Sequence, residues 1–287
     1  MSDAVWGRVG ALLDMIKFAH TVFALPFALM GMLLAARGLP GPGTVLGILA
    51  AMVGARTAAM AWNRIADAEI DGRNPRTAGR HLPAGLVRPA EAWALTLGGA
   101  ILLVLAAWAL NPLCLKLAPL ALAVVFAYPF AKRFTVLCHF LLGLALAAAP
   151  LGAWIAVTGS WSWKIVPLGL AVLLWTAGFD VLYALQDVEF DRASGLHSIP
   201  QRLGTGRALR LAARLHVALV VLLALQIPLF GLGAWYGLGL LAAAALLLYE
   251  HALVTPSDLS RLDAAFFTMN GVISVVMFSA TFLDVLL

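Results

Sequence analysis

The chain has 287 residues, of which 63% are hydrophobic and only 11% are charged, and its mean hydropathy is +0.96. A water-soluble domain of this length does not tolerate such a composition, so the sequence indicates a protein whose main solvent is lipid. The net charge of +5 raises the question of a nucleic-acid partner, but the basic residues are spread over short segments between apolar runs, which argues against one.

Stretches of about 20 apolar residues, the length that spans a bilayer, predict the elements in chain order. Nine such stretches are centred near residues 27, 52, 101, 121, 146, 174, 219, 241 and 275. The first begins directly after Lys17 and is longer than the apolar core of a cleaved signal peptide, so we expect it to remain as a helix. The predicted fold is an all-α polytopic membrane protein with nine transmembrane helices, forming a single domain over residues 1–287.

The positions of the basic residues predict the orientation of the chain in the membrane. Fifteen of the 19 lysines and arginines fall on the side of the N-terminus, whereas Arg37, Lys116 and Lys164 fall on the other side. By the positive-inside rule, the N-terminus is expected in the cytoplasm. Arg56 lies within the second predicted helix, where we expect it either to face the interior of the bundle in a supporting role or to form an ion pair.

One face of the first predicted helix is polar. Lys17, His20 and Thr21 share this face, because residues at i, i+3 and i+4 are neighbours on a helix. Lys17 is therefore a candidate ligand for a phosphate group. The alternative is an anchor at the membrane interface.

Half of the 14 acidic residues lie in two short segments. In the first, at about 100° per residue, Asn63, Asp67 and Asp71 fall within about 80° of one another and form one polar stripe. Glu69 projects to the opposite side of the helix, which excludes it as a ligand. Ionisable residues at helix ends in a membrane are costly, so the stripe is a candidate functional site.

The second acidic segment repeats this pattern. On a continuous α-helix, Asp180, Asp187 and Asp191 fall within about 40° of one another, with Tyr183 beside them and Glu189 on the opposite side. An even number of predicted crossings separates the two segments, so both reach the same membrane face and the stripes can meet.

Facing carboxylates repel one another unless a cation lies between them, and hard divalent ions prefer oxygen ligands. The sequence therefore predicts that Asp67, Asp71, Asp187 and Asp191 bind Mg²⁺, with Asp180 in support. Each acidic segment is followed by an arginine-rich loop, which contains Arg76 and Arg80 after the first. Carboxylates, metal and guanidinium groups together are typical of a diphosphate site.

These segments resemble the UbiA family of intramembrane aromatic prenyltransferases. The second acidic segment matches the family motif D-x-x-Y-x-x-x-D-x-x-x-D at every fixed position, and the first resembles N-D-x-x-D-x-x-x-D except that Arg64 replaces the first Asp. Arg64 is expected to pair with Asp67 or Asp71 or to contact the diphosphate itself. Two further stretches are similar to the family: Arg76-Thr77-x-x-Arg80-x-Leu82-Pro83-x-Gly85 and Tyr128-Pro-Phe-Ala-Lys132-Arg133.

The resemblance implies a role for each matching residue. The four aspartates would bind Mg²⁺, Tyr183 would approach the reacting end of the prenyl chain, and the diphosphate would be positioned by Asn63, Arg76, Arg80 and Lys132. The substrates would be a polyprenyl diphosphate and a small aromatic acceptor of the hydroxybenzoate type, in ubiquinone or menaquinone biosynthesis. The Asn63-Arg64 version looks like a bacterial MqnP-like branch, which implies the cytoplasmic (inner) membrane and an active site toward the cytoplasm.

Other functions remain open from the sequence. A haem-, chlorophyll- or dihydroxynaphthoate-type transferase of the same family would differ only in its acceptor, and the prenyl chain length and oligomeric state are likewise open. An ion-coupled transporter also places carboxylates at helix ends. A CDP-alcohol phosphotransferase would resemble a D-G-x-x-A-R pattern, which this sequence lacks.

Overall fold

The structure is a computed structural model that describes residues 2–17, 23–256, 258–259, 261–262 and 268–287. Apart from an isolated bridge between Thr255 and Asp258, the regular elements of these residues are helices. The longer helices are α1 (Ser2–Met15), α2 (Leu25–Ala36), α3 (Pro42–Arg73), α4 (Pro89–Leu110), α5 (Pro112–Ala131), α6 (Cys138–Thr158), α7 (Val166–Tyr183), α10 (Thr205–Ala224), α12 (Ala234–Ala252) and α13 (Asn270–Leu286). Short helical turns connect them: η2 (Trp163–Ile165), η3 (Ala184–Asp187), α8 (Val188–Ala193), α9 (Ile199–Leu203) and α11 (Gln226–Phe230).

Every predicted apolar centre lies inside one of the longer helices, from α2 to α13. Among the described residues, six helical stretches are long and apolar enough to cross a membrane, and α2 and α13 are shorter apolar helices. The all-helical membrane bundle is therefore confirmed, whereas the number of nine spans remains a prediction.

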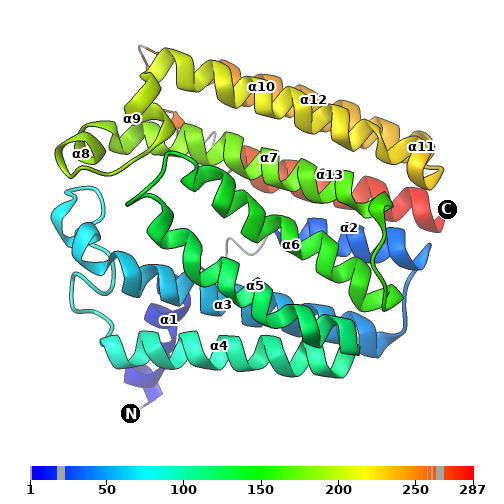
Figure 1. Cartoon of the computed structure of the whole chain (residues 1–287), viewed down its shortest axis with the longest axis horizontal. Coiled ribbons are helices and arrows are strands. Elements are labelled where there is room, and N and C mark those ends of the chain that lie inside the picture. The colour runs from blue at the N-terminus through cyan, green and yellow to red at the C-terminus, as the bar shows by residue number, and fades with distance from the viewer. Residues whose placement is uncertain (1, 18–22, 257, 260, 263–267) are drawn as a thin grey trace.

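The helices form one bundle in which neighbours in space differ from neighbours in sequence (Figure 1). Helices α3 and α4 pack side by side along one edge, α10 and α12 lie along the other, and α2, α6, α7 and α13 fill the middle. The loop after α3 and the short helices α8 and α9 lie together at one end of the bundle.

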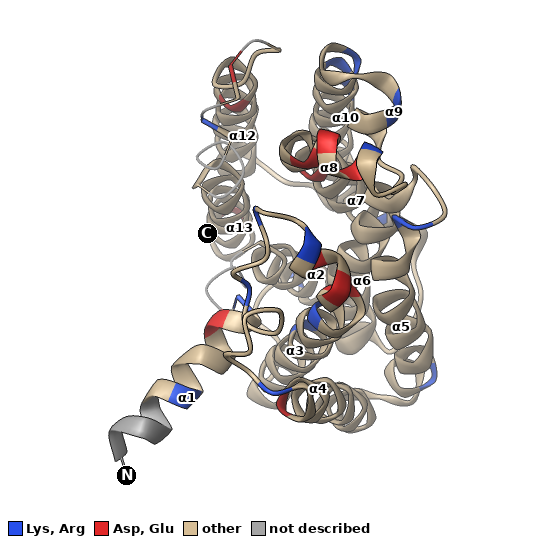
Figure 2. Cartoon of the chain, turned by 90° about the vertical axis from the view of Figure 1, so that its left-hand side faces the viewer, with Lys and Arg blue, Asp and Glu red and all other residues tan. Residues whose placement is uncertain are grey.

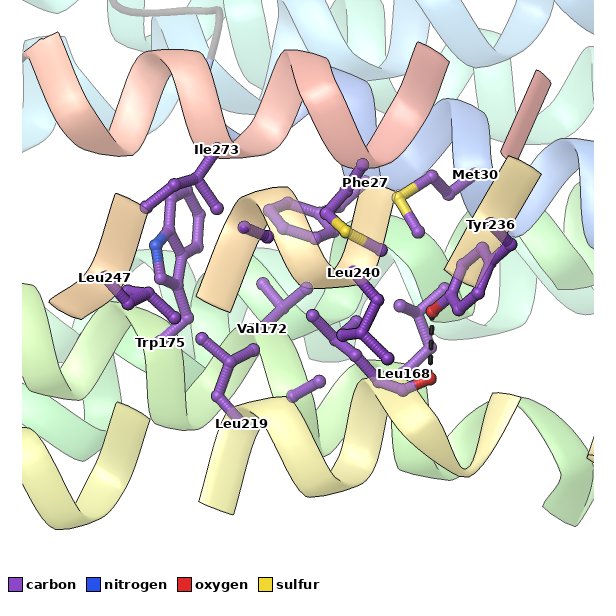
Figure 3. Close-up of a cluster of buried hydrophobic side chains, with 14 of the residues drawn as sticks. Phe27, Met30, Leu168, Val172, Trp175, Leu219, Tyr236, Leu240, Leu247 and Ile273 are labelled. Carbon is purple, nitrogen blue, oxygen red and sulfur yellow. Dashed lines mark hydrogen bonds between the residues drawn. The ribbon is translucent and has the colours of Figure 1, made fainter. Parts of the chain in front are cut away.

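Large apolar side chains hold the middle of the bundle together (Figure 3). Trp175 of α7 is fully buried, packs against Phe27 of α2 and donates its indole N–H to Asn270 of α13 at 2.6 Å. Tyr236 of α12 donates its hydroxyl proton to the Leu223 carbonyl at 2.9 Å. These two bonds pair the polar atoms of large buried aromatic side chains in a region where no water can satisfy them.

Small residues allow α3 and α4 to approach closely. A Cβ atom added to Gly99 would lie 2.6 Å from the backbone nitrogen of Ala58, and one added to Gly54 would lie 2.7 Å from the nitrogen of Leu103. Such contacts between backbones are typical of helix pairs in membranes. This packing fixes the position of α3, which carries the first acidic stripe.

The second acidic segment does not form the continuous α-helix that the projection assumed. Helix α7 ends at Tyr183, and the chain passes through the 3₁₀ turn η3 before α8 begins at Val188. A 3₁₀ turn advances by about 120° per residue, so Asp191 takes a different direction from the predicted one. Such interruptions often mark functional segments.

Candidate active site

Charged residues gather at the end of the bundle where α3 ends and α7 continues into η3 and α8 (Figure 2). Here the two predicted stripes meet. Asn74, directly after α3, donates a hydrogen bond to Asp187 of η3 at 2.9 Å, although the two residues are far apart in the sequence. The meeting of the two acidic segments is therefore confirmed by geometry.

The Arg76 side chain lies in the loop after the first acidic segment and donates three hydrogen bonds to the second. Its Nε and Nη2 atoms donate to the two oxygens of Asp187 at 2.9 and 2.5 Å, and its Nη1 atom donates to the Tyr183 hydroxyl at 2.8 Å. Burial opposes the charged form, but the bonds to Asp187 and Tyr183 raise the pKa of Arg76 above its ordinary value. A two-point pair of this kind fixes the plane of the guanidinium.

The acids of α3 also have basic partners. Arg80 places one nitrogen 2.7 Å from both oxygens of Asp71. Asp67 accepts a hydrogen bond from Asn63 at 3.0 Å and lies 3.5 Å from Arg133. All of these side chains belong to the predicted site except Arg133, which follows α5.

Asp191 lies behind the other three acids and is fully buried. Lys132 approaches one of its oxygens to 2.7 Å, and the Ser198 hydroxyl donates to the other at 2.9 Å. Asp191 is not among the residues that line the cavity described below, whereas Lys132 is. The physical reason is the 3₁₀ turn, which redirects α8.

The remaining site residues surround a cavity of about 910 Å³. Its volume suits a ligand of drug size or larger. Seven lysines and arginines line the cavity against five aspartates, so the formal charge of its wall favours an anion. The basic residues are Lys17, Arg56, Arg64, Arg76, Arg80, Lys132 and Arg133, and the acids are Asp14, Asp67, Asp71, Asp180 and Asp187.

The deeper wall of the cavity is apolar and aromatic, and it includes Leu142, Leu146 and Phe179. Asp180 lines it as well, and its carboxylate lies 2.6 Å from the ring of His139. The cavity thus combines a charged mouth with an apolar floor, which suits a molecule that has a charged head and a hydrocarbon chain.

Arg56, Arg64 and Lys17 occupy one side of the cavity. Arg64 donates to the Met15 carbonyl at 3.2 Å, and its expected pairing with Asp67 or Asp71 is wrong, because those acids pair with Arg133 and Arg80. Arg56 lines the cavity and donates to the carbonyl of Lys17 at 3.2 Å. Lys17 itself pairs with Asp14 at 3.3 Å, and His20 and Thr21 lie outside the described residues.

The carboxylates do not form a ready-made metal cluster. Within the described part of the chain, no three His, Cys, Asp or Glu side chains lie close enough together to hold a metal ion. Three of the predicted ligands, Asp67, Asp71 and Asp187, nevertheless line the same cavity and supply the hard oxygen ligands that Mg²⁺ prefers. In the chemistry of its donors, the site fits a divalent ion that arrives together with an anionic substrate.

The two glutamates that were excluded as ligands lie away from the main cavity. The Glu69 side chain is 86% exposed and pairs with Arg73 outside the main cavity, and Glu189 is exposed on α8. Sequence reasoning missed Asn74, Arg133 and His139. Arg133 stands in the stretch Y-P-F-A-K-R that resembles the family, and Asn74 lies two residues before the stretch that begins at Arg76, whereas His139 has no signal in a single sequence.

An all-helical membrane bundle with carboxylate and guanidinium groups around an amphipathic cavity defines an intramembrane enzyme for an anionic lipid substrate. The profile of the UbiA prenyltransferase family matches residues 24–272. The chain belongs to this family and is a prenyltransferase. This assignment does not favour the transporter alternative.

Two relatives with established names are similar to this chain in sequence. The 4-hydroxybenzoate octaprenyltransferase of Aeromonas salmonicida strain A449 is 34% identical over 262 residues, which cover 87% of this chain and 86% of that protein. The enzyme of the same name from Vibrio atlanticus strain LGP32 is 32% identical over 252 residues, 88% of each chain.

Two solved structures share the fold. The apo structure of a UbiA homolog from Aeropyrum pernix K1 has a TM-score of 0.85 and 37% identity, and the match covers 93% of this chain and 98% of that one. A UbiA homolog from Archaeoglobus fulgidus bound to DMAPP and Mg²⁺ has a TM-score of 0.72, 20% identity and coverage of 96% and 98%. The second likeness concerns the fold alone.

Proposed function

We propose that this protein transfers a polyprenyl group from a prenyl diphosphate to 4-hydroxybenzoate, in a Mg²⁺-dependent step of quinone biosynthesis. One observation carries the proposal: acids of α3 and η3, interleaved with Arg76, Arg80 and Arg133, line the mouth of a single cavity whose floor is apolar. The names of the relatives supply the acceptor. The solved homolog with DMAPP and Mg²⁺ supports the donor and the metal.

The basic side chains would bind the diphosphate. Arg76, Arg80, Arg133 and Lys132 each hold a carboxylate, and in the substrate complex each would exchange this partner for a phosphate oxygen. Asn63 and Arg64 would complete the phosphate contacts, with Lys17 at the edge of the cavity. Charge-assisted bonds to phosphate are strong, and guanidinium suits them because it presents several donors in one plane.

The carboxylates released by this exchange would hold the metal. Asp67, Asp71 and Asp187 would bind Mg²⁺ directly, and Asp191 would join them if its ion pair with Lys132 opens. When bound, Mg²⁺ supplies electrostatic stabilisation of the departing diphosphate.

The protein itself would protect the reacting carbon. The allylic C–O bond breaks as the diphosphate takes its electron pair, and the Tyr183 ring beside Arg76 lies next to the phosphate site. Leu142, Leu146 and Phe179 line the deeper cavity and would exclude water from the allylic cation until the aromatic ring attacks.

Arg56 is the candidate for binding the carboxylate of the acceptor. Its Nε–H group is buried and has no hydrogen-bond partner among the described residues, although the side chain lines the cavity. An unsatisfied buried donor is costly, so a carboxylate that accepts this bond would be favoured. An acceptor with a carboxylate, as in hydroxybenzoate, fits this residue better than an uncharged ring.

The Asn63-Arg64 motif favours the MqnP-like bacterial branch within the family. We further propose nine membrane spans, an N-terminus in the cytoplasm and a cavity that opens to the cytoplasmic face of the inner membrane. The Lys and Arg residues near the cavity mouth support this orientation.

The proposal is tested with the purified protein in lipid nanodiscs. It is incubated with labelled prenyl diphosphates of several lengths, Mg²⁺, and 4-hydroxybenzoate, dihydroxynaphthoate or haem as acceptor. We expect diphosphate release and a prenylated hydroxybenzoate, detected by mass, and loss of both with a chelator. Absence of diphosphate release under all conditions would refute the proposal, and product with another acceptor would correct the substrate.

A further inference from the structure

The carboxylate of Asp180 differs from the other acids of the cavity in its partner. Asp14, Asp67, Asp71 and Asp187 each lie within ion-pair distance of a lysine or arginine. Among the described residues, the partner of Asp180 is a histidine instead. A carboxylate held by a fixed cation is a weak base, whereas one held by a neutral donor remains able to accept a proton.

His139 is held in one tautomer by the backbone. The Ile199 N–H group donates to its Nε2 atom at 3.3 Å, so Nε2 acts as an acceptor and carries no proton. The proton then resides on Nδ1, which donates to Asp180 at 2.6 Å. The histidine is 2% exposed and the carboxylate 24%, and both line the cavity, so the carboxylate is the more accessible of the two. This is the arrangement in which a buried histidine orients a base.

The depth of Asp180 also suits this role. It lies seven residues before Asp187, which places it roughly 12 Å further into the membrane than the phosphate site, since α7 rises about 1.5 Å per residue and the 3₁₀ turn η3 about 2.0 Å. Phe179, next to Asp180 in α7, lines the same cavity, as do Leu142 and Leu146 of α6. An allylic carbon and one aromatic ring would fit between the diphosphate and Asp180.

We propose that Asp180, positioned by His139, accepts the proton that the aromatic ring loses during prenyl transfer. This inference rests on the proposed function. The bond between the allylic carbon and the diphosphate oxygen breaks, and diphosphate leaves with the electron pair. A ring carbon forms the new carbon–carbon bond. The ring then loses its proton to the Asp180 carboxylate, and the C–H electrons restore aromaticity.

The full-length protein in nanodiscs tests this role with Asp180→Asn and, as a matched control, Glu189→Gln on the exposed face of α8. Asp180→Asn should lower product formation about 10²- to 10⁴-fold, the usual contribution of a general base. Diphosphate release should persist, with water trapping the cation as prenyl alcohol. An acceptor deuterated on its ring should react more slowly in this variant, because proton removal becomes rate-limiting.

His139 acts through Asp180, so its variants provide a second test that holds even if Asp180→Asn does not fold. His139→Ala should lower kcat roughly tenfold or more, with the KM for prenyl diphosphate unchanged, and should show the same ring-deuterium effect. His139→Gln should restore kcat, because an amide can donate to Asp180 and accept from Ile199.

Three results would overturn the inference. In the first, diphosphate release and product formation fall in parallel in Asp180→Asn, which would place Asp180 in the diphosphate site. In the second, product formation is unchanged in Asp180→Asn. In the third, His139→Gln is as impaired as His139→Ala. If the wild-type protein forms no prenylated product, the proposed function fails instead, so the two failures are distinguishable.

Discussion

At the scale of single residues, the site is a network in which each predicted metal ligand is neutralised by a base. Asp187 shows this most clearly, because it accepts bonds from both Asn74 and Arg76. Its side chain is only 9% exposed, so removal of its charge would leave the guanidinium without its partner. Asp187 therefore serves to orient Arg76 as well as to bind metal in the proposed reaction.

Asp187→Asn should lower the rate of prenyl transfer by a factor of about 100 or more, because the site loses a ligand of the Mg²⁺ that would stabilise the departing diphosphate. The measurement is diphosphate release by the purified protein at saturating Mg²⁺. Glu189→Gln, two residues further along the chain and exposed, should retain wild-type activity. Full activity of a well-folded Asp187→Asn would refute the metal-site assignment.

Arg56→Ala should raise the KM for 4-hydroxybenzoate by roughly 10- to 150-fold, the effect of losing a charged hydrogen bond of about 1.5–3 kcal/mol. The KM for the prenyl diphosphate should stay the same, because in the described part of the chain the acids of the phosphate site pair with Arg76, Arg80 and Arg133 and not with Arg56. Steady-state kinetics with each substrate varied in turn provides the measurement. Equal changes in both KM values would mean that Arg56 acts on the phosphate site or on folding.

At the scale of elements, the site depends on two helices that are held by different means. Helix α3 is fixed by its close packing against α4 through Gly54 and Gly99. Helix α7 is fixed by its apolar contacts around Trp175, and then departs from α-helical geometry at η3. That departure places Asp187 at the cavity wall and turns Asp191 toward Lys132.

The packing of α3 on α4 predicts different effects for two adjacent glycines. In Gly99→Ala the new methyl group would collide with the backbone of α3, at 2.6 Å from the Ala58 nitrogen. We expect a loss of about 1–3 kcal/mol of stability and a lower Tm in detergent. Gly98→Ala meets no atom within 4 Å and should leave the Tm unchanged or raise it slightly. An equal Tm for the two variants would contradict this packing.

At the scale of the whole molecule, charged residues mark the end of the bundle that faces water, and exposed apolar side chains mark the surface that faces lipid. Charged residues gather at the end that holds the cavity mouth (Figure 2). Large apolar side chains such as Leu105, Leu241 and Leu248 are exposed along the helices, where lipid would surround them. Trp161 and Trp163 lie between α6 and α7 at the opposite end, a position typical of the membrane interface.

The proposed orientation is tested by cysteine labelling in intact bacterial cells, in a variant that lacks Cys114 and Cys138. A membrane-impermeant maleimide should label Ser160→Cys, which lies between α6 and η2. It should label Ser194→Cys, after α8, only once the cells are broken. Both positions are exposed in the structure, so the comparison depends on the side of the membrane. Labelling in the reverse order would invert the predicted topology.

The sequence by itself determined the solvent, the helical class and many of the charged residues that line the cavity. Apolar length locates the helices because backbone groups in lipid must bond within their own helix, and acids are rare enough in such a chain that two clusters are conspicuous. The pairing of Asn74 with Asp187, the burial of Asp191 and the partnership of His139 with Asp180 were decided only by the tertiary structure. Each depends on contacts between distant segments, and on a 3₁₀ turn that periodicity cannot reveal.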